Sequence, residues 1–278
     1  MISDSSRRRF IQGTLAASAA PALQTQGAAA PSDDIKLGVA SYSLREFSRR
    51  LCINMVKQLN TPYLTIKEFH ALYRSTPEEL DRARAEFTRG GMQLTGGGTV
   101  YMLKDDDADI RTYFDYAKRL GLPMMNIGAT HQSLLRIEKF AREYNIKIAV
   151  HNHGPEDKNF PAPSDALKLI KDMDPRMGVC VDVGHTTRTG KDVLAEMEMA
   201  GSRLLDLHVK DLRDLKVSGS QCDVGDGAMP IVAIFKLLKK MNYGGVVHLE
   251  YEINADNPLP GMQRSFSYMR GVIAGLRG

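Results

Sequence analysis

Short apolar runs alternate with longer amphipathic stretches along the chain from about residue 34 onward. The short runs are rich in Val, Ile, Leu and Met, a length and composition typical of buried strands. The longer stretches repeat apolar residues every three or four positions, which predicts helices. The apolar runs are 35–41, 63–68, 92–96, 123–128, 146–151, 177–183, 204–209 and 245–250. The stretches with helical periodicity are 76–90, 109–120, 134–144, 164–173, 192–199 and 230–241.

This alternation predicts an α/β protein with a (β/α)8 TIM-barrel architecture in a single domain. Strands separated by helices favour a parallel sheet, and eight units in about 245 residues match the usual size of such a barrel. An open, doubly wound sheet is the alternative. It would normally carry a glycine-rich phosphate loop after the first strand, whereas Ser41, Tyr42, Ser43 and Leu44 stand there.

The first thirty residues have the pattern of a twin-arginine export signal. Three arginines at 7–9 precede Phe10, a mildly apolar stretch at 13–23 and a small-residue run at 27–30. We therefore expect residues 1–30 to be a signal peptide, residues 31–278 to form the barrel, and the protein to be periplasmic or extracellular. The apolar stretch is shorter than the roughly 20 residues that span a bilayer, so we expect no stable membrane anchor.

Composition and charge mainly exclude functions. The 278 residues carry a formal net charge of +4, which falls to about +2 without the first thirty residues because they hold three arginines and one aspartate. Such a near-neutral barrel lacks the basic surface that a nucleic-acid partner requires. The cysteines Cys52, Cys180 and Cys222 are too few for a disulfide framework.

Polar residues gather at the carboxyl ends of the predicted strands, where barrel enzymes carry their active sites. Five of the seven histidines lie at these ends, together with several acids and lysines. Converging imidazoles and carboxylates form a mixed nitrogen and oxygen ligand set for a divalent metal such as Mn, Co, Zn, Mg or Fe. The segments concerned are IKEFH at 66–70, VHNH at 150–153, VDVGH at 181–185, LHVKD at 207–211 and LEYE at 249–252.

These segments resemble the xylose isomerase-like TIM-barrel superfamily, also described as the AP endonuclease 2 family. The superfamily contains sugar isomerases, ketose 3-epimerases, inosose dehydratases and endonuclease IV, and the resemblance covers about residues 35–275. A sugar phosphate isomerase/epimerase-like branch is the most similar. The strings that carry the resemblance are DVGH at 182–185, HVKD at 208–211, CDVGDG at 222–227, LEYE at 249–252, HNHGPED at 151–157 and IKEFH at 66–70.

The resemblance implies that Asp182, His208 and Glu250 are metal ligands. The better-known epimerases carry a glutamate on the fifth strand, and His151 stands in its place here. Four ligands remain, but one of the two carboxylates that move a proton on opposite faces of a carbon is missing.

Further strand-end residues complete the predicted site. Lys67 and Glu156 are candidates for the catalytic base, with an ordinary Lys67–Glu68 ion pair as the alternative. The resemblance places His185 against the substrate, and orienting Asp182 is its alternative role. The candidate substrate contacts are His70, His153, Lys210 and Glu252, and the aromatic residues that could form a sugar-binding floor, or simply pack in the core, are Tyr42, Phe69, Tyr101 and Phe160.

Such a site predicts a metal-dependent sugar isomerase or epimerase that removes a proton next to a carbonyl through an enediolate. The missing fifth-strand glutamate favours, as the alternative, a keto-sugar lyase or hydratase of the 3-keto-glycoside or inosose type. A non-catalytic sugar-binding barrel and an endonuclease IV-like enzyme are further alternatives, although the latter needs a histidine after the third strand where Gly98–Tyr101 stand. The expected partner is a small sugar or keto-sugar, and the oligomeric state stays open, a homo-oligomer included.

Overall fold

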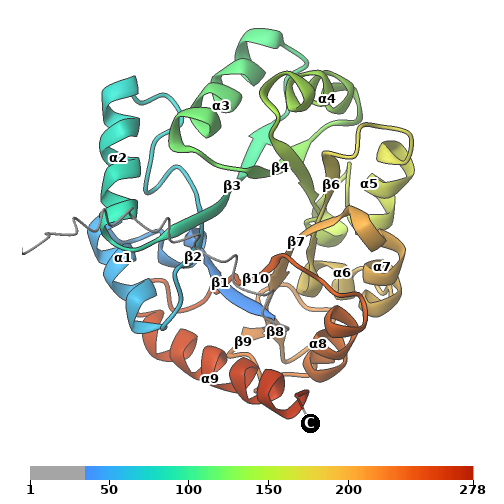
Figure 1. The fold of residues 1–278 in the computed structure, drawn as a ribbon. Coiled ribbons are helices and arrows are strands. Elements are labelled where there is room, and N and C mark those ends of the chain that lie inside the picture. The colour runs from blue at the N-terminus through green and yellow to red at the C-terminus, as the bar shows by residue number, and fades with distance from the viewer. Residues whose placement is uncertain (1–34, 278) are drawn as a thin grey trace, which may run out of the picture. The chain divides into compact units, whose positions relative to one another are not determined.

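Eight parallel strands close into a barrel in the computed structural model, which describes residues 35–277 (Figure 1). The strands form the central ring and the helices surround it, which confirms the predicted (β/α)8 fold. Around the ring the hydrogen-bonded order is β1-β10-β7-β6-β5-β4-β3-β2. The strands are β1 (Lys36–Ala40), β2 (Tyr63–Ile66), β3 (Gln93–Met102), β4 (Met124–Ala129), β5 (Lys147–His151), β6 (Met177–Asp182), β7 (Leu204–Val209) and β10 (Val246–Leu249).

The helices begin and end where local chemistry favours it. Thr76 and Glu79 form a capping box before α2, and Gly121 and Asn145 adopt left-handed conformations after α3 and α4. The helices are α1 (Arg49–Gln58), α2 (Pro77–Arg89), α3 (Asp107–Leu120), α4 (His131–Tyr144), α5 (Pro163–Ile170), α6 (Val183–Arg188), α7 (Val193–Ala200), α8 (Ile231–Lys240) and α9 (Leu259–Gly275). Each of three 3-10 turns in the described chain lies between a strand and a helix: η1 (Ser41–Leu44), η2 (Gly154–Glu156) and η3 (Gly201–Arg203).

The longer β3 and the additional helix α1 are two differences from the predicted elements. Strand β3 continues to Met102 rather than ending at residue 96, because Val100 and Met102 pair with Ile127 and Ala129 of β4. Helix α1 was absent from the expected helices, yet it buries Cys52, Ile53 and Val56 against the barrel. In both places tertiary contacts decide the structure over a local pattern that glycines or charges weaken.

A two-stranded hairpin, β8 (Asp211–Leu212) and β9 (Gln221–Cys222), follows β7 outside the barrel. The Asp211 carboxylate accepts hydrogen bonds from the backbone N–H groups of Gly225, Gly227 and Met229. A Cβ atom at Gly227 would lie 2.2 Å from Asp211 Oδ1, so only glycine fits this close approach. The Gln221 side chain donates to the Glu250 carbonyl at 2.7 Å, which ties the hairpin to the end of β10.

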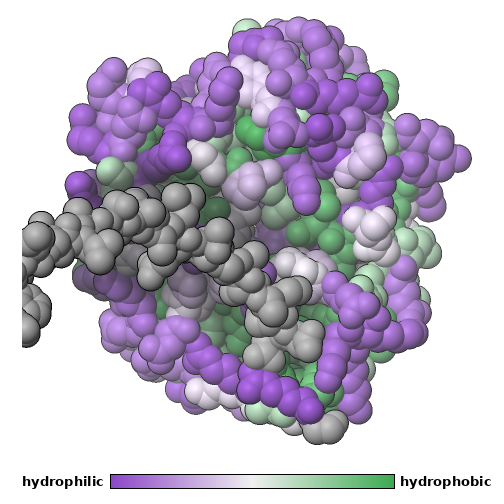
Figure 2. All heavy atoms as spheres, viewed as in Figure 1, coloured by the Kyte–Doolittle hydropathy of each residue, from purple (hydrophilic) through white to green (hydrophobic). Residues whose placement is uncertain are grey.

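Hydrophilic side chains cover much of the outer ring of helices on the face seen in Figure 2. Among the described residues, no helix combines the length and apolar character needed to cross a membrane. Residues 1–34, which contain the expected export signal, and residue 278 lie outside the described part, so export stays a prediction.

Candidate active site

Four ionisable side chains converge inside the barrel mouth from strands that are consecutive in the ring. His151 ends β5, Asp182 ends β6, His208 lies on β7 and Glu250 directly follows β10. One ligand atom from each lies within 4.8 Å of the others, and all four side chains are buried. The structure thus brings together the four residues proposed as ligands from the sequence, and we call them the four-residue cluster.

Local structure aims these side chains inward. Asp182 pairs in register with His208, so the two lie side by side on neighbouring strands. Asp182 is also the N-cap of α6, and its Oδ1 accepts the His185 backbone N–H at 2.8 Å. Because Oδ1 is used in this cap, Oδ2 is left to face the cluster.

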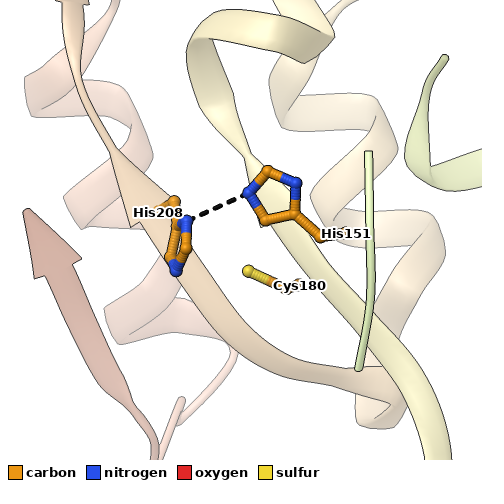
Figure 3. Close-up of side chains that lie close together, drawn as sticks. All are labelled: His151, Cys180 and His208. Carbon is orange, nitrogen blue, oxygen red and sulfur yellow. Dashed lines mark hydrogen bonds between the residues drawn. The ribbon is translucent and has the colours of Figure 1, made fainter. Parts of the chain in front are cut away.

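The two imidazoles meet edge to edge. His151 Nε2 lies 3.0 Å from His208 Nδ1, as the dashed line in Figure 3 marks. Cys180, two residues before Asp182 on the same face of β6, places its sulfur beside both rings (Figure 3). Burial raises the pKa of this thiol well above its usual range, with Asp206 adding to the effect.

Lys210 supplies positive charge to the cluster from within the protein. Its Nζ lies 3.0 Å from Asp182 Oδ2, 2.9 Å from Glu250 Oε2 and 2.7 Å from Glu252 Oε2. A Cβ atom at Gly184 would lie 2.7 Å from Lys210 Cγ, so the glycine of the DVGH string makes room for the lysine stem. Burial disfavours the ammonium, but these carboxylates outweigh it and hold the pKa of Lys210 well above its usual range.

The charges of the cluster depend on one another. Burial and the neighbouring imidazoles hold the pKa of His151 well below its usual range, so this ring is neutral. Burial also acts against charge on His208, but Glu250, Asp206 and Asp182 outweigh it and raise the pKa to about 9. Burial opposes ionisation of Glu250 as well, yet Lys210 and His208 keep its pKa well below the usual range.

This donor set fits a divalent cation. Two imidazole nitrogens and two carboxylate oxygens are the ligand types of Zn²⁺, Mn²⁺, Co²⁺ and Fe²⁺ sites. Among the described residues, the buried Asp182 Oδ2 accepts no hydrogen bond, although the Lys210 ammonium is close to it. An acceptor aimed into a cluster without a donor is what a metal ligand requires.

His185 and Glu156 are held together at the mouth by Arg188. The Arg188 guanidinium pairs with the Glu156 carboxylate and donates from Nη1 to His185 Nδ1 at 3.0 Å. Burial, reinforced by Lys210, lowers the pKa of His185 to about 3. Since arginine can only donate, the neutral His185 ring carries its proton on Nε2.

Tyr101 contacts both His153 and Lys67. Tyr101 Oη lies 3.2 Å from His153 Nε2, and the His153 ring lies 4.4 Å from that of His151. Lys67, only 8% exposed, has its Nζ 4.9 Å from the Tyr42 ring centre, 5.4 Å from that of Tyr101 and 5.8 Å from that of Phe69. No carboxylate of the described chain forms an ion pair with Lys67, so aromatic faces alone surround its charge.

His70, an expected substrate contact, is not at the mouth, and Phe160 follows the alternative given for it of packing in the core. His70 is buried, and its Nε2 lies 3.2 Å from the Leu44 carbonyl oxygen, so its ring supports η1. Phe160 is buried against His131 and forms no exposed floor. Both follow polar or strand-end segments, but their side chains turn toward the core.

One recess in the protein surface lies at the predicted site, and a larger one lies elsewhere. His185, Lys210 and Glu252 line a cavity of about 140 Å³ beside the cluster, together with Gly184, Arg188 and Gln221. A larger recess of about 810 Å³ lies between α2 and α3 and contains none of the strand-end site residues. The smaller cavity is the relevant one because the buried charges adjoin it.

Sequence reasoning did not identify a group of polar residues below the cluster. Asn126, Asp206 and His248 are buried within the barrel and connect to His208. Asp206 and His248 each stand two residues before a cluster residue, and this spacing places them on the same inward face. This two-residue spacing is the signal in the sequence that could have identified Asp206 and His248.

The fold is a (β/α)8 barrel, and at the carboxyl ends of its strands it carries a buried cluster of two histidines and two acids that could hold a divalent metal. The chain belongs to the xylose isomerase-like TIM barrel family, whose model matches residues 56–272. This confirms the resemblance noted in the sequence.

Individual relatives are more distant. An inosose dehydratase from Mesomycoplasma hyopneumoniae is 25% identical over 162 residues, which cover 51% of this chain and 53% of the relative. The match to this curated relative therefore spans about half of its length.

Solved structures share the whole barrel. A 3-keto-D-glucoside 4-epimerase from Escherichia coli is 15% identical with a TM-score of 0.71, covering 85% of this chain and 99% of the other. A D-psicose 3-epimerase from Clostridium cellulolyticum H10 is 16% identical with a TM-score of 0.68, covering 86% and 99%. At these identities the likeness establishes the fold.

The buried position of His70 predicts a pH dependence of stability. Burial lowers its pKa to about 4, so between about pH 6.5 and pH 4 the unfolded chain binds a proton that the native protein does not. Stability is therefore lost as the pH falls through this window. We expect His70→Gln to reduce the loss in unfolding free energy between pH 7 and pH 4 by about 3 kcal/mol, measured by urea denaturation. The exposed His131→Gln serves as control, and an equal loss in wild type and His70→Gln would contradict the prediction.

Proposed function

We propose that this protein is a divalent-metal-dependent sugar isomerase or epimerase that removes a proton next to the carbonyl of a keto-sugar. The observation that carries the proposal is the buried four-residue cluster, in which Asp182 Oδ2 pairs with the Lys210 ammonium but accepts no hydrogen bond. His151, Asp182, His208 and Glu250 would hold the metal. A bound divalent cation supplies positive charge to the carbonyl oxygen and so acidifies the adjacent C–H bond.

Three further side chains would stabilise the developing charge, accept the proton and bind the substrate. The Lys67 ammonium lies over the rings of Tyr42, Tyr101 and Phe69, and a positive charge at this place suits stabilisation of the negative oxygen of an enediolate. Glu156, whose pKa is lowered by Arg188 despite partial desolvation, is ionised near neutral pH and is the candidate proton acceptor. The Nε2–H of His185 is available to hydrogen-bond a substrate hydroxyl.

A second candidate is elimination or hydration of a keto-sugar. It is favoured by His151, which stands in the cluster where a carboxylate could protonate the opposite face of the carbon, and by the ion pair with Arg188 that engages Glu156 outside the cluster. The relatives include proteins named as an inosose dehydratase and as a 3-keto-D-glucoside 4-epimerase, in line with both chemistries.

The metal site is tested by Asp182→Asn. Asparagine retains the α6 cap but removes the carboxylate, so we expect metal affinity to fall by more than about 100-fold, measured by calorimetric titration with Mn²⁺ and Co²⁺. Asp192, which caps α7 away from the cluster, provides the matched variant Asp192→Asn, for which affinity should not change. Wild-type affinity in Asp182→Asn would refute the ligand set.

The reaction is tested by isotope exchange. We expect the metal-loaded protein, incubated in D₂O with ketoses, inososes and 3-keto-glycosides, to place deuterium on the carbon next to the carbonyl of one of them, detected by proton NMR. An isomer or epimer supports the first function and an unsaturated product the second. Tight sugar binding with neither exchange nor product would identify a non-catalytic barrel.

The role of Lys67 is tested in the same assay. Lys67→Met should slow exchange by about 100-fold with unchanged metal content, because the charge near the developing oxyanion is lost. The exposed Lys104→Met is the control. Full exchange by Lys67→Met would remove this residue from the mechanism.

We also infer export by the twin-arginine route from the sequence of residues 1–30. Replacing Arg7 and Arg8 together by lysine should retain the protein in the cytoplasm of a bacterial host, measured by cell fractionation. Equal export of both forms would argue against this route.

A further inference from the structure

A layer of polar side chains crosses the barrel directly below the four-residue cluster. Thr95, Asn126, Asp206 and His248 come from β3, β4, β7 and β10. The last three are at most 1% exposed. An apolar layer would fill this part of a barrel equally well, and burying a carboxylate costs several kcal/mol before its partners compensate. The polar layer therefore calls for a role beyond filling space.

Hydrogen bonds join this layer from one side of the barrel to the other. Thr95 Oγ1 lies 2.8 Å from His248 Nε2, and His248 Nδ1 lies 2.6 Å from Asp206 Oδ1. Asn126 Nδ2 donates to Asp206 Oδ2 at 2.6 Å. Asp206 Oδ1 also accepts the Leu207 backbone N–H at 2.9 Å. Both carboxylate oxygens thus accept hydrogen bonds, as expected for an ionised group.

The neighbouring strand is shaped to admit His248. Gly38 of β1 pairs with His248 in register, and a Cβ atom at Gly38 would lie 2.7 Å from His248 Cδ2. The imidazole occupies space that any other residue at position 38 would fill. The close fit against Gly38 fixes the position of the His248 ring, which hydrogen-bonds Asp206.

The layer contacts only one edge of the His208 ring. Asn126 Nδ2 lies 3.2 Å from His208 Nε2, and Asp206 Oδ2 lies 3.7 Å from it, an ion-pair distance rather than a hydrogen bond. The opposite edge, Nδ1, faces His151 at 3.0 Å and Glu250 Oε1 at 3.3 Å. These contacts fix the orientation of the ring, so Nδ1 is the nitrogen that faces the cluster. With a cation on Nδ1 in place of a proton, the ring would keep its one proton on Nε2, and the Asp206 carboxylate beside Nε2 would stabilise that form.

We propose that Asp206, held in place by His248 and Asn126, is a positioning residue that orients the His208 ring with Nδ1 toward the proposed metal site. This rests on the proposed metal site. It assigns a function to residues that contact the cluster only at the Nε2 edge of His208, and it makes the polar layer part of the metal-binding machinery rather than of the barrel core.

The test measures Co²⁺ binding to the full chain together with the melting temperature of the metal-free protein. Asp206→Asn keeps the size of the side chain and removes its charge, and we expect the Kd for Co²⁺ to rise by about 10- to 100-fold with altered d–d absorption bands. Thr61→Val is the matched control, because Thr61 is buried and donates to the Leu37 carbonyl at 2.6 Å before the start of β2, at the opposite end of the strands from the cluster. The Thr61→Val variant should have a lower melting temperature and an unchanged Kd for Co²⁺.

The outcomes separate the two proposals. Failure of the wild-type protein to bind Co²⁺ would overturn the proposed metal site. Wild-type binding with an unchanged Kd and spectrum in Asp206→Asn would overturn the positioning role alone, even if the melting temperature falls. If Asp206→Asn does not fold, His248→Gln carries the test: a raised Kd supports the proposal and an unchanged Kd overturns it.

Discussion

The buried ammonium of Lys210 is the interaction on which the rest of the site depends. It lies within 3.0 Å of oxygens from Asp182, Glu250 and Glu252, three acids that would otherwise repel one another in the barrel interior. Losing one partner of such a buried pair typically costs about 3–5 kcal/mol. Gly184 leaves room for the lysine stem, so the glycine, the lysine and the acids form one interdependent unit. A metal bound beside it would share carboxylates with an internal cation.

Barrel geometry arranges the interior in layers, and the two-residue repeat of each strand assigns side chains to them. Asp182, His208 and Glu250 form the upper layer, and Cys180, Asp206 and His248, each two residues earlier, lie below. The upper layer carries the chemistry that we propose, while Asp206 in the lower layer lies against the Nε2 edge of the His208 ring. Function and internal packing are therefore built from the same strands.

Much of the architecture and part of the site could be predicted from the sequence. The eight-fold repeat, the strand-end position of the site and the grouping of His151, Asp182, His208 and Glu250 are confirmed by the structure, while their role as ligands stays a prediction. The extent of β3, the helix α1 and the inward position of His70 were not foreseen. These features depend on contacts with distant segments, which local periodicity does not report.

By itself the sequence determined which residues stand at strand ends, because alternation and helical periodicity are local properties of the chain. Only the tertiary structure decided which of those residues meet. Residues 151 and 208 are 57 positions apart and touch because the closed ring places β5 and β7 on either side of β6. His70 also follows a strand, yet its ring turns beneath η1. Side-chain direction and distance across the barrel follow from the closed ring and its register, and no single segment contains that information.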